Sequence, residues 1–431
     1  MASPRRHRPM PGLIQARFAD ALRRAHQVYL PGCAGHSLLF ERWLQEVRDA
    51  AAKATFSGVW IPGVNRFDPC ALHEGARARG IFVGPEQRRA WEAGRFDYLP
   101  LHYSEAARWF AMPGRFDLVL LHVAPPDAQG RCSLSLAADF TPSVWHGLSE
   151  DAMVLAHVNP RLPRTAGPWV TWSRLDAIVE AEAPVLHVAD EVPETTLVAV
   201  ARQVAALVRD GDTLQLGLGR LQAAVLSALS GHRGLRVHSG MVSDGLLTLR
   251  DAGALATPAG GMPPVCTGVA LGSAALHAAM ADTDLVRFEP VSYTHAQATL
   301  AALPRLVSIN SALEIDLLGQ INCETLSGEQ VSGVGGLVDF ARGARASDGG
   351  RAIVAVTAIV GRHARSRFVP QLSPGPVGLA RTDVDLVVTE HGVADLRQAS
   401  VDARAQALIR IAAPAHREAL AGAWHALRRT L

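Results

Sequence analysis

Lysine is almost absent from this sequence: Lys53 is the only one, and arginine supplies the rest of the 42 basic residues. A Schiff-base enzyme needs a lysine that reaches its carbonyl substrate, and a P-loop protein needs one within its glycine-rich motif. Lys53 lies in the segment AAKATF, which fits neither pattern. The sequence therefore argues against both classes, and biased codon usage accounts for its richness in arginine and alanine.

Cysteine is also scarce, and the residues lie far apart in the sequence. No two cysteines have the spacing of zinc ligands, and their odd number argues against a disulfide framework. We therefore expect no metal site and a reducing, cytoplasmic compartment. The net charge of +2 favours neither nucleic acid nor an anionic membrane as a partner. The five cysteines are Cys33, Cys70, Cys132, Cys266 and Cys323.

Formal charge is missing from residues 252–281, a stretch long enough to cross a bilayer. Pro258, Pro263, Pro264 and several glycines interrupt it and would break a spanning helix. We predict a buried loop followed by a helix of small residues, and no membrane span. The basic start MASPRRHRPMPG is not followed by a continuous apolar stretch, so no signal peptide is expected.

The length of 431 residues and a hydrophobic content of 48% favour two α/β domains. Apolar runs of strand length alternate with helical patterns, which is typical of mostly parallel sheets covered on both faces. The pattern restarts near residue 190, so we predict domains at 1–190 and 191–431. Expected strands lie at 28–30, 58–61, 80–83, 116–123, 152–158, 185–188, 213–216, 235–238, 305–309, 352–356 and 384–388. Expected helices lie at 38–51, 194–208, 221–229, 403–410 and 416–428.

Two groups of glycines are candidates for ligand binding. Gly333, Gly335 and Gly336 form a loop whose backbone N–H groups can approach a phosphate or stabilise an oxyanion. Gly217 and Gly219 lie at a strand-to-helix turn, where a phosphate can bind. For both groups the alternative is a tight turn that needs positive φ.

Two polar residues follow predicted strands and are candidate catalytic residues. Glu390 comes after the strand at 384–388, where side chains line the ligand crevice of an open α/β sheet. A carboxylate there can act as a base or nucleophile, or it can be an acid at a helix N-terminus. Asn310 ends the strand at 305–309 and can orient a carbonyl, or it can be a helix N-cap.

Two other polar pairs are weaker candidates. Glu314 and Asp316 are two residues apart, which on a helix makes a poor acid pair, so structural salt bridging is the better interpretation. Asn159 and Arg164 follow the apolar run 152–158. Arg164 can hold a carboxylate or phosphate, or it can pin a loop, and we favour the loop.

At these motifs the sequence resembles the acetyl-CoA hydrolase and 4-hydroxybutyrate-type CoA-transferase family. The resemblance runs along nearly the whole chain. In the first half it rests on YLPLHYSE, VAPPDAQGRCSLSLAADF and VNPRLPRT. In the second half it rests on SINSALEIDLLGQIN, SGVGGLVDFARGARASDGG and VVTEHGVADLR.

The resemblance implies two CoA-transferase-type domains of the NagB/RpiA-like fold with an active site between them. It also implies an acyl-CoA substrate, a small carboxylate acceptor, no permanently bound cofactor, and a homodimer as a common arrangement. In the usual mechanism a glutamate within a stretch like HSEMxSDG attacks the thioester and carries CoA. Here the matching stretch is HSGMVSDG, so Gly240 stands in place of that glutamate. The GLG turn matches a family motif but lacks the proline expected shortly after it.

Gly240 removes the usual nucleophile and leaves two functions open. One is an acyl-CoA transferase or hydrolase in which Glu390 attacks or activates water, with Asn310 and the glycine loop beside it. Hydrolysis suits Gly240 because a missing side chain would leave room for water. The other is a non-catalytic binder of CoA thioesters or a partner subunit. Ser239 and His238 are adjacent in a strand and point to opposite faces, so we expect no dyad between them.

Overall fold

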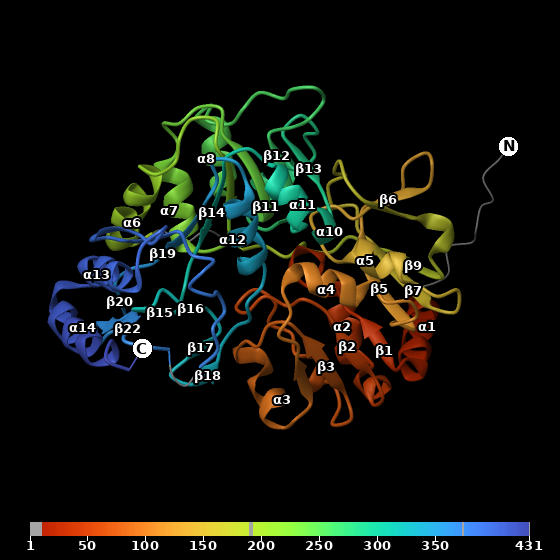
Figure 1. Cartoon of the computed structure of the whole chain (residues 1–431). Helices are drawn as coiled ribbons and strands as arrows, with labels where there is room; N and C mark the ends of the chain where they lie inside the picture. The colour runs from red at the N-terminus through yellow and green to blue at the C-terminus, as the bar shows by residue number, and fades with distance from the viewer. Residues whose placement is uncertain (1–10, 189–192, 373–374, 431) are drawn as a thin grey trace.

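The computed structural model describes residues 11–188, 193–372 and 375–430. Its first large sheet has seven parallel strands, and helices pack around it (Figure 1). In spatial order the strands are β4 (Phe96–Tyr98), β3 (Arg77–Gly80), β2 (Thr55–Ser57), β1 (Gln27–Tyr29), β5 (Leu118–Val123), β7 (Met153–Val158) and β9 (Ala177–Glu180). The helices of this half are α1 (Pro11–Arg24), α2 (Leu38–Glu46), α3 (Arg88–Glu92), α4 (Tyr103–Phe110) and α5 (Thr141–His146).

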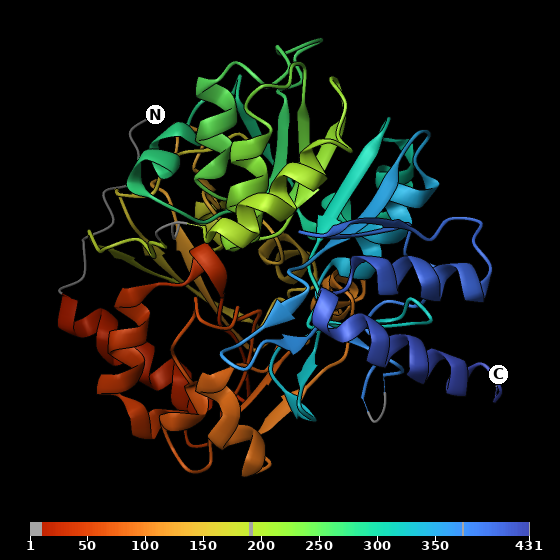
Figure 2. The same cartoon turned by 90° about the vertical axis from the view of Figure 1, so that its left-hand side faces the viewer.

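The second large sheet has eight strands, and only its last pair is antiparallel. In spatial order they are β13 (Val286–Phe288), β12 (Val265–Ala270), β11 (Arg236–Val242), β10 (Thr213–Leu216), β14 (Leu306–Asn310), β19 (Arg351–Ala355), β23 (Leu386–Thr389) and β24 (Gly392–Asp395). Helices lie on both sides of this sheet (Figure 2). They are α6 (Thr195–Ala205), α7 (Arg220–Ala228), α8 (Gly245–Asp251), α9 (Ala274–Ala279), α10 (Val291–Thr294), α11 (Gln297–Ala302), α12 (Leu337–Ala346), α13 (Val401–Ile411) and α14 (Pro414–Leu427).

The two sheets confirm the predicted α/β class with mostly parallel strands. Strands β5 and β12 are buried at every position, as expected for parallel strands covered on both faces. One hydrophobic cluster continues from the first sheet into the second and includes Val119 and Val265. The boundary predicted near residue 190 falls at 189–192, outside the described residues.

Several sequence predictions need correction. The strand at 213–216 is confirmed. The strand predicted at 58–61 is wrong, because β2 ends at Ser57, and the one predicted at 80–83 shares only Gly80 with β3. The apolar residues of those runs lie in buried loops that follow β2 and β3. An apolar run therefore marks burial here, and it extends past the last residue of each strand. No strand covers 185–188, and the edge strand is β9 instead.

The uncharged stretch 252–281 is also not arranged as predicted. Residues 257–262 are an exposed loop, where the backbone of a proline- and glycine-rich segment reaches water. The buried strand β12 and the short helix α9 follow. In the part of the chain that the structure describes, no helix combines the length and apolarity that crossing a membrane requires.

Polar contacts join the two halves beside α12. The Ser104 amide and hydroxyl, at the start of α4, both donate to Asp339 in α12, at 3.1 and 2.6 Å. The Tyr98 hydroxyl donates to Glu324 at 2.6 Å. Helices α4 and α12 accordingly lie side by side at the centre of the molecule (Figure 1). Residues that precede α12 are therefore positioned by both sheets.

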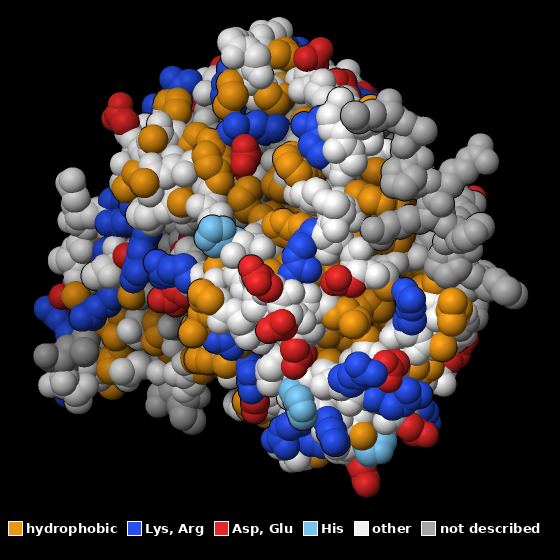
Figure 3. Space-filling model, turned by 90° about the vertical axis from the view of Figure 1, so that its right-hand side faces the viewer, with side chains coloured by type: hydrophobic (Ala, Val, Ile, Leu, Met, Phe, Trp, Pro, Cys, Tyr) orange, Lys and Arg blue, Asp and Glu red, His pale blue; other side chains and the backbone are white. Residues whose placement is uncertain are grey.

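The surface carries charges of both signs in a mixed pattern. On the face drawn in Figure 3, basic and acidic side chains are interspersed around apolar patches. Lys53 is exposed, in the turn before β2. All five cysteines are free thiols.

Candidate active site

Gly240 lies within β11, after two residues whose side chains form hydrogen bonds with backbone carbonyl groups. The Ser239 hydroxyl donates to the Leu216 carbonyl oxygen at 2.6 Å. The His238 Nε2 atom forms a hydrogen bond with the Thr294 carbonyl oxygen at 3.0 Å. Because the two side chains have different partners, they do not form a dyad, in agreement with the strand geometry.

The space beside Gly240 is filled by His295, which directly follows α10. A Cβ atom on Gly240 would lie 2.7 Å from His295 Cε1 and 3.0 Å from its Nε2. These distances are shorter than a carbon side chain tolerates without movement of the ring. The Cβ position of Gly240 is therefore not an empty space for a water, because an imidazole from another element fills it.

Aromatic neighbours hold the His295 ring on two sides. Its centroid lies 5.0 Å from that of Tyr103, in the first half, and 4.5 Å from that of Phe340, in α12. The side chain is 2% exposed. Burial, with a smaller contribution from His238, lowers the pKa of His295 to about 3, so the ring is neutral at pH 7.

The Thr294 hydroxyl is the side-chain hydrogen-bond partner of the His295 ring among the described residues. It lies 2.9 Å from Nδ1 and 3.3 Å from the Pro290 carbonyl oxygen. Because a hydroxyl has one proton, it donates either to Nδ1 or to Pro290, and these contacts are compatible with both tautomers of the ring. No hydrogen bond to Nε2 is found in the described part of the chain.

The glycine loop brings both halves of the molecule to this point. A Cβ atom on Gly333 would lie 2.0 Å from the Ile81 carbonyl oxygen, in the first half. Gly335 has a φ of +57°, and its carbonyl oxygen accepts from the Tyr103 amide at 3.2 Å. Gly336 precedes α12, and a Cβ atom there would lie 2.6 Å from His295 Nε2. A positive-φ turn thus explains Gly335, whereas close approach explains the other two glycines.

The second glycine group joins β10 to α7. Gly219 is the N-cap of α7 and has a φ of +113°, so a turn explains it. Gly217 has no such constraint: the nearest atom to a Cβ there would be Gln222 Nε2, at 3.8 Å. Gly217 and Gly219 as CoA-binding residues stay a prediction.

Asn310 ends β14 and faces a neighbouring strand. Its Nδ2 atom donates to Gln215 Oε1, in β10, at 3.0 Å and to Ser308 Oγ at 3.1 Å. No helix begins after Asn310, so the N-cap alternative is wrong. Gln215 is a polar neighbour that the sequence analysis missed, because only the pairing of β10 with β14 brings it beside Asn310.

Glu390 lies in the two-residue turn that joins β23 to β24, so the helix-terminus alternative is also wrong. Both carboxylate oxygens accept from the Ala358 amide, at 2.9 and 3.2 Å. The buried guanidinium of Arg367 lies nearby and feels the Glu390 charge. Four inter-strand spacings separate β23 from β11, which is about 19 Å along the sheet. Glu390 and Gly240 thus occupy separate parts of one sheet edge.

The remaining polar candidates have structural contacts. Glu314 and Asp316 lie on β15 (Glu314–Asp316), not on a helix. Glu314 pairs with Arg365 at 3.8 Å, and Asp316 accepts backbone hydrogen bonds from Leu318 and Gln320. The predicted structural role is therefore supported.

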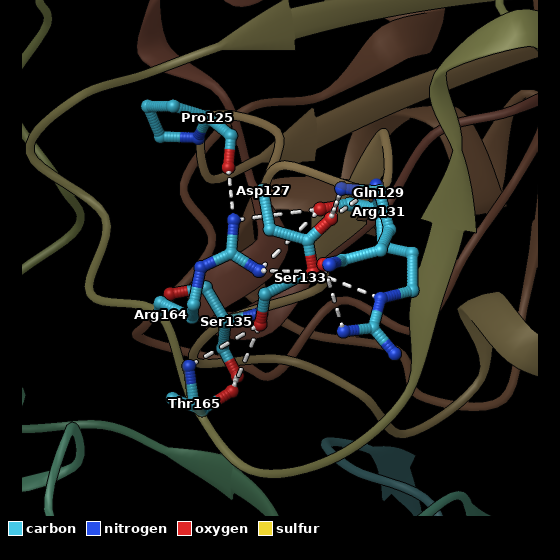
Figure 4. Close-up of polar contacts among 8 residues, drawn as sticks. All are labelled: Pro125, Asp127, Gln129, Arg131, Ser133, Ser135, Arg164 and Thr165. Atoms are coloured by element: carbon cyan, nitrogen blue, oxygen red, sulfur yellow. Dashed lines mark hydrogen bonds and ion pairs between the residues drawn. The ribbon is translucent and has the colours of Figure 1, made fainter.

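Arg164 and Asn159 also stabilise loops. The Arg164 guanidinium donates to the Pro125 carbonyl oxygen at 2.6 Å and lies 3.4 Å from Asp127 (Figure 4). The buried Asn159 donates to the Ala183 carbonyl oxygen at 2.9 Å. Both contacts agree with the loop-pinning interpretation.

One carboxylate outside the predicted set lies near Gly240. Asp139 contacts Gly268 of β12, whose Cβ position would be 3.4 Å from Asp139 Cβ and 3.1 Å from the Gly240 carbonyl oxygen. Burial raises the pKa of Asp139 to about 6. Within the segments that the structure describes, no cluster of histidine, cysteine or acidic side chains could hold a metal ion.

A cavity of about 830 Å³ opens beside this site. Its wall includes Arg108 and His146 from the first half and His295 and Arg342 from the second. A volume of this size accommodates a cofactor-sized ligand. His295 thus lies against Gly240 and also lines this cavity.

Comparison with known proteins agrees with this geometry. Residues 272–424 match the model of the acetyl-CoA hydrolase/transferase C-terminal domain. The chain is 37% identical over 351 residues to a 4-hydroxybutyrate coenzyme A transferase of Clostridium kluyveri, covering 80% of this chain and 81% of that protein. It is 32% identical over 412 residues to a succinyl-CoA:cyclohexane-1-carboxylate CoA transferase of Geobacter metallireducens, covering 93% and 91%.

A solved structure extends the comparison to the whole fold. RipA from Yersinia pestis superimposes with a TM-score of 0.85 at 25% identity, covering 95% of this chain and 96% of that one. The fold and site thus define an α/β enzyme that acts on CoA thioesters. The chain belongs to the acetyl-CoA hydrolase and CoA-transferase family.

Proposed function

We propose that this enzyme cleaves a small acyl-CoA thioester by direct attack of water, without a covalent enzyme–CoA intermediate. The observation that carries the proposal is the filled space at Gly240. The family mechanism needs a glutamate there, but Gly240 has no carboxylate and the His295 ring occupies the Cβ position. Attack by a water held at the ring is the simplest chemistry that this arrangement supports.

The other predicted residues have roles in this proposal. The amides at Gly335 and Gly336 stabilise the oxyanion, and Gly333 lets the loop approach the first half. Gly217 and Gly219 bind phosphates of CoA at the start of α7. Asn310 and Glu390 contact the pantetheine arm, whose amide groups need hydrogen-bond partners and whose length can span the sheet edge. Glu390 is partly buried, and both its oxygens accept from a backbone amide, which supports a fixed orientation.

A second candidate is CoA transfer through a different carboxylate. Asp139 favours it, because this carboxyl group lies beside the strand next to Gly240 and burial raises its pKa to about 6. The curated relatives named above are CoA transferases. The acceptor would then be a small carboxylate such as succinate or 4-hydroxybutyrate.

A mass-spectrometric time course tests the two candidates. The purified full chain is incubated with acetyl-, butyryl-, succinyl- and 4-hydroxybutyryl-CoA, with and without acetate and succinate. Release of free CoA without an acceptor, and no CoA adduct on the intact protein, would support hydrolysis. Acyl exchange only with an acceptor, with an adduct on Asp139 or Glu390, would establish transfer. Unchanged thioesters throughout would refute both.

The proposal also covers the compartment, the cofactor requirement and the oligomeric state of the protein. We infer a cytoplasmic enzyme, which its five free cysteines support. It needs no permanently bound cofactor, because CoA enters as part of the substrate. A homodimer is proposed on the family resemblance, and sedimentation of the purified chain measures it.

A further inference from the structure

We propose that His295 is the general base of this reaction and takes over the position of the missing glutamate. The inference rests on the proposed hydrolysis and names the group that performs it. It is carried by the place of the ring, by its tautomer and by its access to a cavity.

The place of the ring is the first argument. Cε1 and Nε2 lie 2.7 and 3.0 Å from the Cβ position of Gly240, and Nε2 lies 2.6 Å from that of Gly336. The Nε2 corner of the imidazole therefore points between β11 and the start of α12. A water bound at Nε2 would lie close to the amides proposed to stabilise the oxyanion.

The tautomer is the second argument. The proposal assigns the tautomer in which Thr294 Oγ1 accepts the Nδ1 proton at 2.9 Å and donates to Pro290, so that the lone pair of the ring lies on Nε2. A general base must present a lone pair to the proton that it removes. The arrangement is that of a base with an orienting partner, in which Thr294 is a positioning residue.

Access is the third argument. His295 lines the 830 Å³ cavity, together with side chains from both halves. Arg108 and Arg342 lie in the same wall, as do the acidic Glu105 and Asp339, and a guanidinium can bind a phosphate of a CoA thioester. A substrate bound in this cavity would therefore lie beside His295, which is 2% exposed.

The proposed reaction balances without any further reactant. Nε2 accepts a proton from water while the water oxygen bonds to the thioester carbonyl carbon. The tetrahedral oxyanion then collapses, the carbon–sulfur bond breaks, and the Nε2 proton passes to the CoA sulfur. The products are the free acid and CoA, and His295 returns to its neutral form.

The strength of the base limits the rate. Burial lowers the pKa of His295 to about 3, so the imidazole is unprotonated at neutral pH but weakly basic. General bases contribute most when their pKa lies near the working pH. We therefore expect a contribution at the low end of the usual range, about 100-fold.

The test compares wild type with His295→Asn. Asparagine can still donate an N–H to Thr294 but has no lone-pair nitrogen at the Nε2 position. We expect kcat for acyl-CoA hydrolysis to fall about 100-fold while KM changes little. His277→Asn is the matched control: His277 is also buried, and its ring contacts His187 instead of the site. This control is expected to retain wild-type kcat.

A second variant distinguishes a base from a side chain that only fills space. In His295→Gly, added imidazole is expected to restore part of the lost hydrolysis, because it can enter the vacated volume and supply a lone pair. Wild-type or higher kcat in His295→Asn, or in His295→Gly without imidazole, would overturn the inference and mark the ring as an obstruction. Absence of hydrolysis in wild type would instead count against the proposed function.

Discussion

Gly240 and His295 share one small volume, and their separation in the sequence hides the relationship. A glutamate restored by Gly240→Glu would meet Cε1 of the ring at 2.7 Å from its Cβ atom. We therefore predict that this single substitution does not restore a covalent CoA intermediate. Gly240→Glu combined with His295→Gly has room for the carboxylate and is expected to form one. Intact-mass measurement after incubation with acyl-CoA compares the two variants, and a CoA adduct on the single variant would contradict the steric argument.

Glu390 is tested by a substitution that keeps its shape. Glu390→Gln can still accept from the Ala358 amide but removes the charge that faces Arg367. We expect kcat to fall at least about tenfold because the substrate arm is misplaced, while CoA affinity stays within about twofold. Steady-state kinetics and calorimetric titration with CoA measure the two effects. Wild-type kcat in this variant would remove Glu390 from the mechanism.

The pH dependence of turnover reports on His295 itself. A histidine with an ordinary pKa of about 6.5 would lose its base form as the pH falls from 8 to 6. Burial lowers the pKa of His295 to about 3, so its neutral form persists over that range. We therefore predict that kcat stays nearly constant between pH 8 and 6. A decline of about fourfold between pH 8 and 6 would show that the catalytic base titrates normally.

These residues also show what the sequence could predict of the site. The departure at Gly240 is visible because its flanking motif matches the family pattern. His295 carries no such signal: it lies in the segment SYTHAQ, and its closeness to Gly240 depends on how α10 packs against β11. Gln215 and Asp139 were missed for the same reason, since each reaches the site across a strand pairing or a contact between halves.

At the scale of elements, the loop before α12 acts as the joint between the halves. A Cβ atom on Gly333 would lie 2.0 Å from the Ile81 carbonyl oxygen, a contact with backbone that no rotamer change relieves. We predict that Gly333→Ala lowers the free energy of unfolding by about 1–3 kcal/mol. Urea denaturation measures the change. An unaltered free energy of unfolding would show that the loop before α12 can move away from Ile81 at little cost.

A glycine inside a helix supplies the control for this experiment. Gly422 lies in α14, and no atom lies within 4 Å of the position that its Cβ would occupy. Alanine has the higher helix propensity, so Gly422→Ala is expected to stabilise the protein by about 0.5–1 kcal/mol. If Gly333→Ala lowers the free energy of unfolding and Gly422→Ala raises it, the loss at Gly333 is due to steric conflict and not to the replacement of glycine in general.

Elements differed in how well the sequence predicted them. β10 was located to the residue because Asp212 precedes it and the turn-forming glycines Gly217 and Gly219 follow it. β12 was missed because glycine and proline dominate the stretch before it, and periodicity does not distinguish a short buried strand from a helix. The sequence did not predict whether a helix or a turn follows β23. Glu390 lies in a turn because the chain reverses there and pairs as the antiparallel strand β24.

At the scale of the whole molecule, buried histidines link stability to pH. Burial lowers the pKa values of five histidines. It lowers that of His122 well below its ordinary value and that of His238 to about 4. The others are His157, His277 and His295. The unfolded chain therefore binds more protons than the folded one once the pH falls below about 6.5. We predict a loss of roughly 1 kcal/mol for each fully buried histidine between pH 7.5 and 6.

Asp139 acts in the opposite sense at lower pH. Burial raises its pKa to about 6, so the folded protein takes up this proton before the unfolded chain does. Acidification from pH 6 towards 4 therefore relieves part of the destabilisation caused by the histidines. Thermal unfolding at pH 8, 7, 6 and 5 measures the balance, and a midpoint that rises between pH 7 and 6 would contradict it.

The overall architecture was the most predictable property of the chain. Alternating apolar runs indicated the α/β class, and motifs spread along both halves indicated the family. The shared hydrophobic cluster and the contacts of Asp339 with Ser104 could not be predicted, because they depend on how one sheet sits against the other. The proposed active site lies at that junction, so its details depend on tertiary packing.

The single exposed lysine, Lys53, has a consequence for an enzyme that handles activated acyl groups. Thioesters slowly acylate side-chain amines, and most proteins offer many such targets. Arginine, which stays protonated, supplies the other basic side chains here and is not a comparable nucleophile. The chain therefore offers its own substrate a single lysine ε-amine to acylate. Acylation of Lys53 would thus report background reaction with thioesters, because this exposed residue lies in a turn outside the proposed site.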